Sequence, residues 1–486
     1  MSITQSQSLN TTAHNNRWLF LGVLSAALFL IGADNSILYT ALPVLREQLH
    51  TSEVQALWII NAYPLVLASL LLGTGTLGDK IGHRRMFEVG VVIFGLSSLF
   101  AALAPSATWL IVARGLLGFG AATMMPATLA LIRTTFTDVR ERNTAIGIWG
   151  SVATIGAALG PVLGGFLLEH FYWGSVFLIN VPIALAAVIA TQWLAPPNLA
   201  NPQRHWDLTS SLLAMVTLTG TVLLIKQFAS THIDWAHVGL SAAAMLLGAV
   251  AFQWRQRLLS DPLLTWDIFR NRLFVGGVLA AAMSMFVLAG TEMITTQHFQ
   301  LAEGFSPLQA GLVTAAMALC AFPTSILGGA NLHRWGFQSL IAGGFAFMAV
   351  GSAVAAYALT QGMFPLLIGG LMLSGAGAGL VMSVTSTAII GSAPKHRAGM
   401  AASVEEVSFE FGTLISVAAL GSLFPYFYAL RAPAQYADAM VPQAHQAIST
   451  SYLYILLIVL VVSALSAALT AYAFRGNPKE TAYAHE

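Results

Sequence analysis

Long apolar runs dominate this sequence, and its charged residues are too few to cover a water-soluble fold. The chain has 486 residues, of which 57% are hydrophobic and 8% are charged, whereas a soluble domain carries roughly 25% charged residues. A helix that crosses a bilayer needs about 20 predominantly apolar residues, and runs of this length recur from end to end. The pattern therefore predicts an all-α polytopic membrane protein. It leaves no extramembrane domain large enough for an enzyme.

Fourteen runs are long enough to span a membrane. They cover residues 18–42, 54–74, 86–104, 108–132, 143–168, 174–195, 208–228, 236–254, 273–296, 308–330, 337–359, 363–388, 399–424 and 451–474. If the N-terminus is cytoplasmic, seventeen basic residues fall in inside segments and three in outside segments. Because cytoplasmic loops carry the excess of Lys and Arg, we expect fourteen transmembrane helices with both termini in the cytoplasm.

Several functions are excluded by what the chain lacks. The net charge is +1, so there is no basic field for nucleic acid. No Gly-Lys pair occurs, and a phosphate-binding Walker A loop is therefore absent. The twelve His residues show no ligand spacing, and the single Cys320 provides no partner, so no metal site is predicted. We expect no cofactor.

A short motif occurs twice. Gly75 and Gly82 follow the second apolar run, and Gly329 and Gly336 follow the tenth at the same spacing. Each copy lies on a short cytoplasmic turn between two spans. A weak repeat at this separation is typical of transporters built from two homologous halves.

The motifs together resemble a known family. The turn 75–85 resembles the signature loop of the major facilitator superfamily, and the fourth run, which contains Arg114, resembles its helix-four motif. Asp34 to Pro43, and Asn180 to Pro182, are similar to segments of the fourteen-span drug:proton antiporter (QacA-like) family. The fifth run matches the antiporter motif of proton-coupled drug exporters at Gly147, Gly156, Gly160, Pro161, Gly164 and Gly165.

This resemblance implies a fold and a function. It implies two six-helix bundles, residues 1–195 and 261–486, around a central cavity, with two inserted helices in 196–260. The implied function is proton-coupled antiport in a bacterial inner membrane. Lipophilic organic cations, such as quaternary ammonium biocides, viologens and cationic dyes, would leave the cytoplasm by alternating access driven by the proton gradient. The implied partners are these cations, protons and lipid, and the implied state is a monomer.

Carboxylates inside the apolar runs are the main candidates for coupling. An ionised carboxylate at the bilayer centre costs at least about 2.5 kcal/mol, so we expect such groups to face a cavity. Glu406 and Glu410 are one turn apart on one helix face, and their like charges repel. The pair can hold protons or a cation, but not both. Glu405 lies about 100° further round the helix. Alternatively, all three mark a hydrophilic helix end at the interface.

Three further charged residues have two possible roles each. Asp34, near the middle of the first run, either binds a proton or cation or fixes helix packing. Glu292 lies toward the outer end of the ninth run, in the cavity or in a solvated vestibule. Arg114 either tunes a nearby carboxylate or holds helices by bonding backbone carbonyls. At Asn61 some relatives have an acid, and this side chain cannot titrate.

The turn 75–85 is predicted to be a latch. Asp79, with Lys80, Arg84 and Arg85 nearby, can make charge-assisted bonds that close the cytoplasmic side in one state only. The turn glycines Gly75 and Gly82 belong to the same motif.

The remaining candidates shape the path. The fifth-run glycines let helices approach closely, and Pro161 permits a bend. Tyr39, Trp58 and Tyr63 are candidates to stack on a planar cation in the cavity.

Two alternatives to cation export stay open. One is an exporter of the same fold for another small solute, such as an amino acid, a fatty acid or a siderophore. The other is a membrane sensor that transports nothing. Membrane carboxylates without matching bases favour cations, because an anion carrier would need more than the single membrane Arg114.

Overall fold

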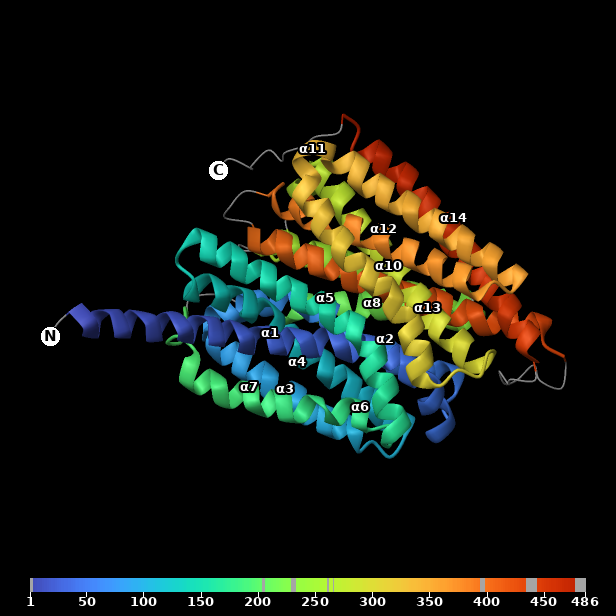
Figure 1. The fold of residues 1–486 in the computed structure, drawn as a ribbon, viewed down its shortest axis with the longest axis horizontal. Helices are drawn as coiled ribbons and strands as arrows, with labels where there is room; N and C mark the ends of the chain where they lie inside the picture. Colours follow the sequence, from blue (N-terminus) through green and yellow to red (C-terminus); the bar gives the residue numbers. More distant parts are fainter. Residues whose placement is uncertain are drawn as a thin grey trace.

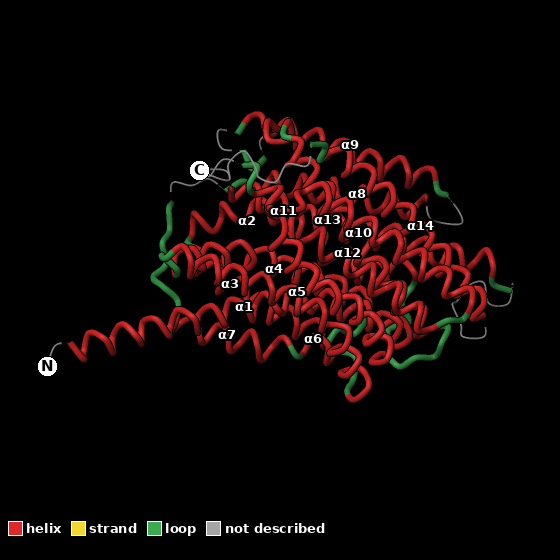
Figure 2. Tube along the Cα trace, turned by 45° about the horizontal axis from the view of Figure 1, so that its top comes forward, coloured by secondary structure: helices red, strands yellow, loops and turns green. Residues whose placement is uncertain are grey.

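The structure is a computed structural model. It describes residues 3–202, 206–228, 233–259, 262–264, 266–393, 398–433 and 444–476. Within these ranges the secondary structure is helical and contains no strand (Figure 2). The all-α prediction is therefore confirmed.

The helices follow one another with short connections. The first part of the chain forms α1 (Ile3–Gln48), α2 (Glu53–Ile81), α3 (His83–Ala102), α4 (Ala107–Thr135), α5 (Val139–His170), α6 (Ser175–Leu178) and α7 (Asn180–Leu194). The inserted helices are α8 (Leu208–Phe228) and α9 (Trp235–Leu258). A 3-10 helix, η1 (Trp266–Arg270), leads to α10 (Arg272–Leu301), α11 (Pro307–Gln361), α12 (Phe364–Ile390), α13 (Ala398–Arg431) and α14 (His445–Ala473).

Every one of the fourteen expected spans has a helical counterpart. Twelve helices of the described part are long and apolar enough to cross a membrane. One of them, α11, has 55 residues, about 80 Å at 1.5 Å per residue, far more than the roughly 30 Å hydrocarbon core. It is interrupted at Gly336 and thus supplies two spans. Helix α5 has 32 residues and supplies the fifth.

The repeated motif produces the same backbone break in both halves. Helix α2 continues beyond its apolar run as far as Ile81, and Gly82 then turns the chain into α3 with φ of 94°. Gly336, its repeat partner, interrupts α11 with φ of 72°. Residues with a Cβ rarely adopt positive φ, so glycine is required at both positions.

Two groups of helices lie side by side (Figure 1). Helices α1 to α7 pack mainly with one another and form the N-half, and α10 to α14 form the C-half. The inserted pair lies against both: α8 contacts α2, α13 and α9. Large apolar side chains cover the outside, as a lipid-facing surface requires. On α9, Trp235, Leu247 and Trp254 are 67–71% exposed.

Candidate functional site

A buried carboxylate lies at the centre of the N-half. Asp34 of α1 is 2% exposed and is ion-paired with Arg114 of α4. Its other oxygen accepts a hydrogen bond from Asn180 Nδ2 of α7 at 3.1 Å. The same amide donates to Ser98 Oγ of α3 at 3.2 Å. Four helices of the N-half therefore converge on one acid.

Arg114 combines the two roles that the sequence left open. Besides the ion pair with Asp34, its Nε donates to the backbone carbonyl of Ile59 in α2 at 3.0 Å. Its guanidinium lies over the ring of Tyr63, 4.6 Å from the centroid, a cation–π geometry. Nη2 is buried and has no hydrogen-bond partner within the described residues. Arg114 thus links α2 to α1, and its Nη2 can still donate a hydrogen bond to a ligand.

The acids of α13 point in two directions. Glu405 is buried and accepts a hydrogen bond from Ser386 Oγ of α12 at 3.0 Å, so it lies within the C-half. Glu406 and Glu410 share a different face and are partly exposed. Oε2 of Glu410 is buried, and no hydrogen-bond partner for it occurs in the described part of the chain. Glu410 therefore offers an oxygen to a proton or a ligand.

Charged groups of the two halves lie near enough to influence one another electrostatically. The charge of Glu410 acts on Arg114, and Tyr63 lies in the field of both Asp34 and Glu410. The separation along the chain is large, but the helices bring these groups to one central region. Tyr39 lies in the electrostatic field of Glu292 and Glu410, and Glu406 lies in that of Glu410. We therefore group these residues under one name, the central site: Asp34, Tyr39, Tyr63, Arg114, Glu292, Glu406 and Glu410.

Trp58 lies elsewhere. With Leu65 of α2 it packs against Val222 of α8 and against Leu414 and Ala418 of α13, in a separate apolar cluster. This position is at the seam where the inserted helix meets both halves.

The glycines of α5 bring that helix close to α1. A Cβ added to Gly156 or Gly160 would collide with α1, and one added to Gly164 would lie only 3.0 Å from the side chain of Ile37. The atoms in the way belong to Phe29, Ala33, Ser36 and Ile37, which flank Asp34 in the sequence. The antiporter pattern thus lets α5 lie directly beside the acid-bearing segment. Gly147 lies outside the residues whose surroundings are described.

The same stretch of α5 also reaches the other half. A Cβ on Gly165 would meet the backbone of Leu308 in α11, and one on Gly311 of α11 would meet the carbonyl of Pro161. The two helices therefore touch backbone to backbone, one from each half.

The comparisons with known proteins agree with this architecture. The Major Facilitator Superfamily model matches residues 24–302 and 273–485. The chain belongs to the Major Facilitator Superfamily. It is accordingly a multi-pass inner-membrane transporter and not an enzyme.

Individual members of the superfamily are similar over most of the chain. The multidrug efflux pump LfrA of Mycolicibacterium smegmatis is 37% identical over 86% of this chain and 83% of its own length. The methyl viologen resistance protein SmvA of Salmonella typhimurium is 35% identical over 84% and 82%. A bacterial homologue of the lysosomal transporter Spinster, solved in an inward-facing conformation, shares the fold with a TM-score of 0.63. That alignment has 15% identity and covers 95% of this chain and 98% of that one.

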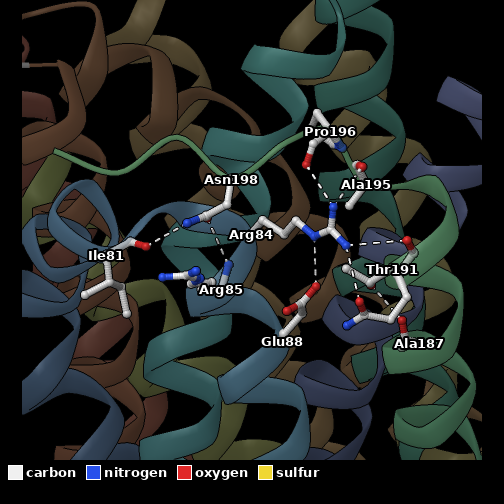
Figure 3. Close-up of polar contacts among 10 residues, drawn as sticks. Ile81, Arg84, Arg85, Glu88, Ala187, Thr191, Ala195, Pro196 and Asn198 are labelled. Atoms are coloured by element: carbon white, nitrogen blue, oxygen red, sulfur yellow. Dashed lines mark hydrogen bonds and ion pairs between the residues drawn. The ribbon is translucent and has the colours of Figure 1, made fainter.

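The superfamily turn between α2 and α3 is tied to the segment that follows α7. Figure 3 shows Arg84 bonded to Glu88 at 2.9 Å and directed at the carbonyls of Ala195 and Pro196, both at 3.4 Å. Asn198 donates to the carbonyl of Ile81 at 2.9 Å and accepts from the backbone N–H of Arg85 at 3.2 Å. These contacts lie within the N-half and its exit segment.

The predicted turn 75–85 is helical as far as Ile81 because α2 continues up to Gly82, so Gly75, Asp79 and Lys80 lie at the end of α2. Asp79 interacts with Nε2 of His83 at 3.0 Å, and its backbone carbonyl accepts from Asn201 N–H at 2.9 Å. Lys80 is partly buried, and Gly75 has open space where a Cβ would lie. Asn198 is not predictable from the sequence, because a neutral side chain in the connection after α7 carries no distinguishing signal.

Hydrogen bonds between the two halves occur at their outer ends. Gln300 Nε2 of α10 donates to the backbone carbonyl of Thr40 in α1 at 2.9 Å. The N–H of Leu308, in the first turn of α11, donates to Glu169 of α5 at 3.3 Å. Together with the Gly165 and Gly311 contacts, these bonds hold the outer side together.

Proposed function

We propose that this transporter is a proton-coupled antiporter that exports lipophilic organic cations from the cytoplasm, including quaternary ammonium compounds, viologens and cationic dyes. The observation that carries the proposal is the pair Glu406 and Glu410 on one face of α13. One oxygen of Glu410 is buried and finds no hydrogen-bond partner among the residues that the structure describes. The printed functions of LfrA, multidrug efflux, and SmvA, methyl viologen resistance, support it.

The proposed cycle uses competition at these carboxylates. When both are ionised, their charge binds an organic cation. The rings of Tyr39 and Tyr63 are buried in this conformation, and Arg114 covers that of Tyr63, so they can stack on a planar substrate only after the halves move. Protons entering from outside neutralise the acids and remove the attraction. The proton-motive force supplies about 2.3 kcal/mol per charge for each 100 mV, plus any pH gradient.

Asp34 and Arg114 take a supporting role in this proposal. Their ion pair places a positive group within electrostatic reach of Glu410. A proton on Asp34 would weaken that pair and change the field at Glu410. The N-half would thus sense protonation and transmit it to the cation-binding face.

The first prediction tests coupling directly. Proteoliposomes with an acidic lumen should release protons when ethidium or methyl viologen is added outside, and the release should saturate with the cation. The variants Glu406→Gln and Asp34→Asn should insert normally and show no cation-driven release, since each loses a titratable group of the central site.

A matched control is Glu47→Gln, which changes an exposed carboxylate at the outer end of α1. It should retain the wild-type response. Cation-driven proton release that persists in both Glu406→Gln and Asp34→Asn would show that the site is wrongly identified. An inserted wild-type protein that responds to none of several cations would instead point to another exported solute.

A further inference from the structure

The inserted helix α8 lies at the seam between the two halves. Its Val222 packs in one apolar cluster with Leu65 of α2, from the N-half, and with Leu414 and Ala418 of α13, from the C-half. In Figure 2, α9 lies at the margin of the molecule with α8 beneath it. The pair therefore covers a place where the two halves meet lipid.

This cluster is next to the acidic face of α13. Leu414 is one helical turn from Glu410, so α8 lies beside α13 close to the depth of the cation-binding carboxylates. The large apolar side chains of α9 are exposed, which is expected for the layer that faces lipid. The inserted pair thus separates this part of the seam from the hydrocarbon.

Toward the N-half, the backbone of α2 at Gly73 lies close to side chains at the start of α8. A Cβ on Gly73 of α2 would lie 2.6 Å from Oγ and 3.9 Å from Cβ of Ser211 in α8. The indole Nε1 of Trp206, just before α8, lies 3.4 Å from the same position. The segment leading to α8 is also bonded to the α2–α3 turn through Asn198. These contacts fix the start of α8 to the N-half.

The two inserted helices are bonded to each other at their cytoplasmic base. Arg255 of α9 makes a forked contact with Asp207, with distances of 2.8 to 3.0 Å. Gln256 Nε2 donates to Ser210 Oγ at 2.7 Å. Partial burial raises the pKa of Asp207, but the hydrogen bonds from Arg255 and Ser210 outweigh it and hold that pKa below its usual value. Helices α8 and α9 therefore form one unit.

Within the described residues, α8 contacts α13 through apolar side chains, and the same cluster includes Trp58 and Leu65 of α2. The α8 side chains in the cluster, Leu218, Val222 and Ile225, are apolar, and so are Leu414 and Ala418 on α13. Apolar contacts are non-directional, so they tolerate relative sliding better than the hydrogen bonds that Asn198 makes to the N-half.

We propose that the α8–α9 pair moves with the N-half as one body and forms a sliding seal against α13, which closes the lipid-side route to the Glu406–Glu410 face. The proposal gives the inserted helices a function: insulation of the coupling site during rocking of the halves. It rests on the proposed function only where transport is used as a readout.

Cross-linking tests which half carries the inserted pair. Cys320→Ser removes the native thiol. In that background, Gly73→Cys with Ser211→Cys places two Cβ atoms 3.9 Å apart, close to the mean of about 3.8 Å for disulfides. Oxidation of this pair should leave ethidium export close to that of the reduced protein. Val222→Cys with Ala418→Cys, joined by a short cleavable dithiol-reactive linker, should stop export until a reductant restores it.

Every other cross-linking result contradicts the proposal. If the 73–211 bond stops export, the pair does not move with the N-half. If the 222–418 link leaves export intact, α13 does not slide past α8. The reduced variants serve as the reference. If they do not export ethidium, that result counts against the proposed function. The effect of each cross-link is then measured as a change in the distance between spin labels on the two halves.

The seal is tested without any substrate. Leu218→Ala with Val222→Ala opens space at the seam and should raise passive proton leak into proteoliposomes several-fold. The matched control, Leu247→Ala with Val250→Ala, removes similar side chains from the exposed side of α9 and should leave the leak unchanged. An equal leak in both double variants would overturn the sealing role.

Discussion

Arg114 links the buried acid of the N-half to a second helix. Its planar guanidinium bonds Asp34 and the carbonyl of Ile59 at the same time. A lysine is a point charge without this fork. We expect Arg114→Lys to reach the membrane but lose export, whereas Arg114→Ala also leaves Asp34 buried without its partner. Loss of one partner of a buried pair costs about 3–5 kcal/mol, so the Tm of Arg114→Ala in detergent should fall clearly.

The double variant Arg114→Ala with Asp34→Asn separates charge from packing. Removing both charges abolishes the uncompensated carboxylate, so the Tm should recover most of the loss, while export stays absent. A Tm for Arg114→Ala equal to that of the wild type would contradict the buried ion pair.

The residue scale also shows what the sequence could predict about the site. Asp34 and Arg114 were predicted individually, because a charge within an apolar run is conspicuous. Their pairing across 80 positions was not, since hydropathy fixes a helix but not its rotation against a neighbour. Asn180 and Ser98 also belong to the site, but a neutral polar residue in an apolar run is not conspicuous. The sequence indicates Asn180 only as part of a segment that is similar to the family.

At the scale of elements, the two turns of the repeated motif predict a pattern of stability. Gly82 and Gly336 combine positive φ with extended ψ, a conformation that is almost exclusive to glycine and costs a residue with a Cβ of order 1–3 kcal/mol. At Gly82 a Cβ would also collide with Asn198. Gly82→Ala and Gly336→Ala should therefore lower the Tm. Gly75→Ala and Gly329→Ala are the matched controls, because both sites are helical with open space at the Cβ.

The controls should be neutral or slightly stabilising, since Ala is favoured over Gly within a helix by roughly 0.5–1 kcal/mol. Thermal unfolding of the four variants in one detergent makes the comparison. If Gly75→Ala lowered the Tm as much as Gly82→Ala, backbone strain at the turn would not be the cause.

Elements were the most predictable level of this molecule. A local apolar run is enough to predict each span, because a helix satisfies all of its backbone hydrogen bonds within the bilayer without help from the rest of the chain. The exact ends were less predictable: α2 extends to Ile81 because a glycine ends it, not because the apolar residues stop. The attachment of the inserted pair depends on close approaches, such as Gly73 with Ser211, that no local pattern contains.

At the scale of the whole molecule, the hydrogen bonds that the described residues make between the halves lie at the outer ends. The Gln300 bond to Thr40 and the Leu308 bond to Glu169 must break when the outer side opens. A neutral hydrogen bond contributes about 0.5–1.5 kcal/mol and one to a charged group about 1.5–3 kcal/mol. Glu169→Ala with Gln300→Ala should therefore shift the equilibrium toward the outward-open state by tenfold or more.

Spin labels at Pro105 and Gln361, exposed positions at the outer ends of the two halves, report this shift as growth of a longer-distance population. Glu47→Ala, which removes an exposed outer carboxylate, should leave the distance distribution unchanged. Both bonds act between the halves and not within them. The double variant should therefore change the distance distribution between the spin labels while its Tm stays near that of the wild type. An unaltered distribution in the double variant would mean that backbone contact at Gly165 and Gly311 alone holds the outer side closed.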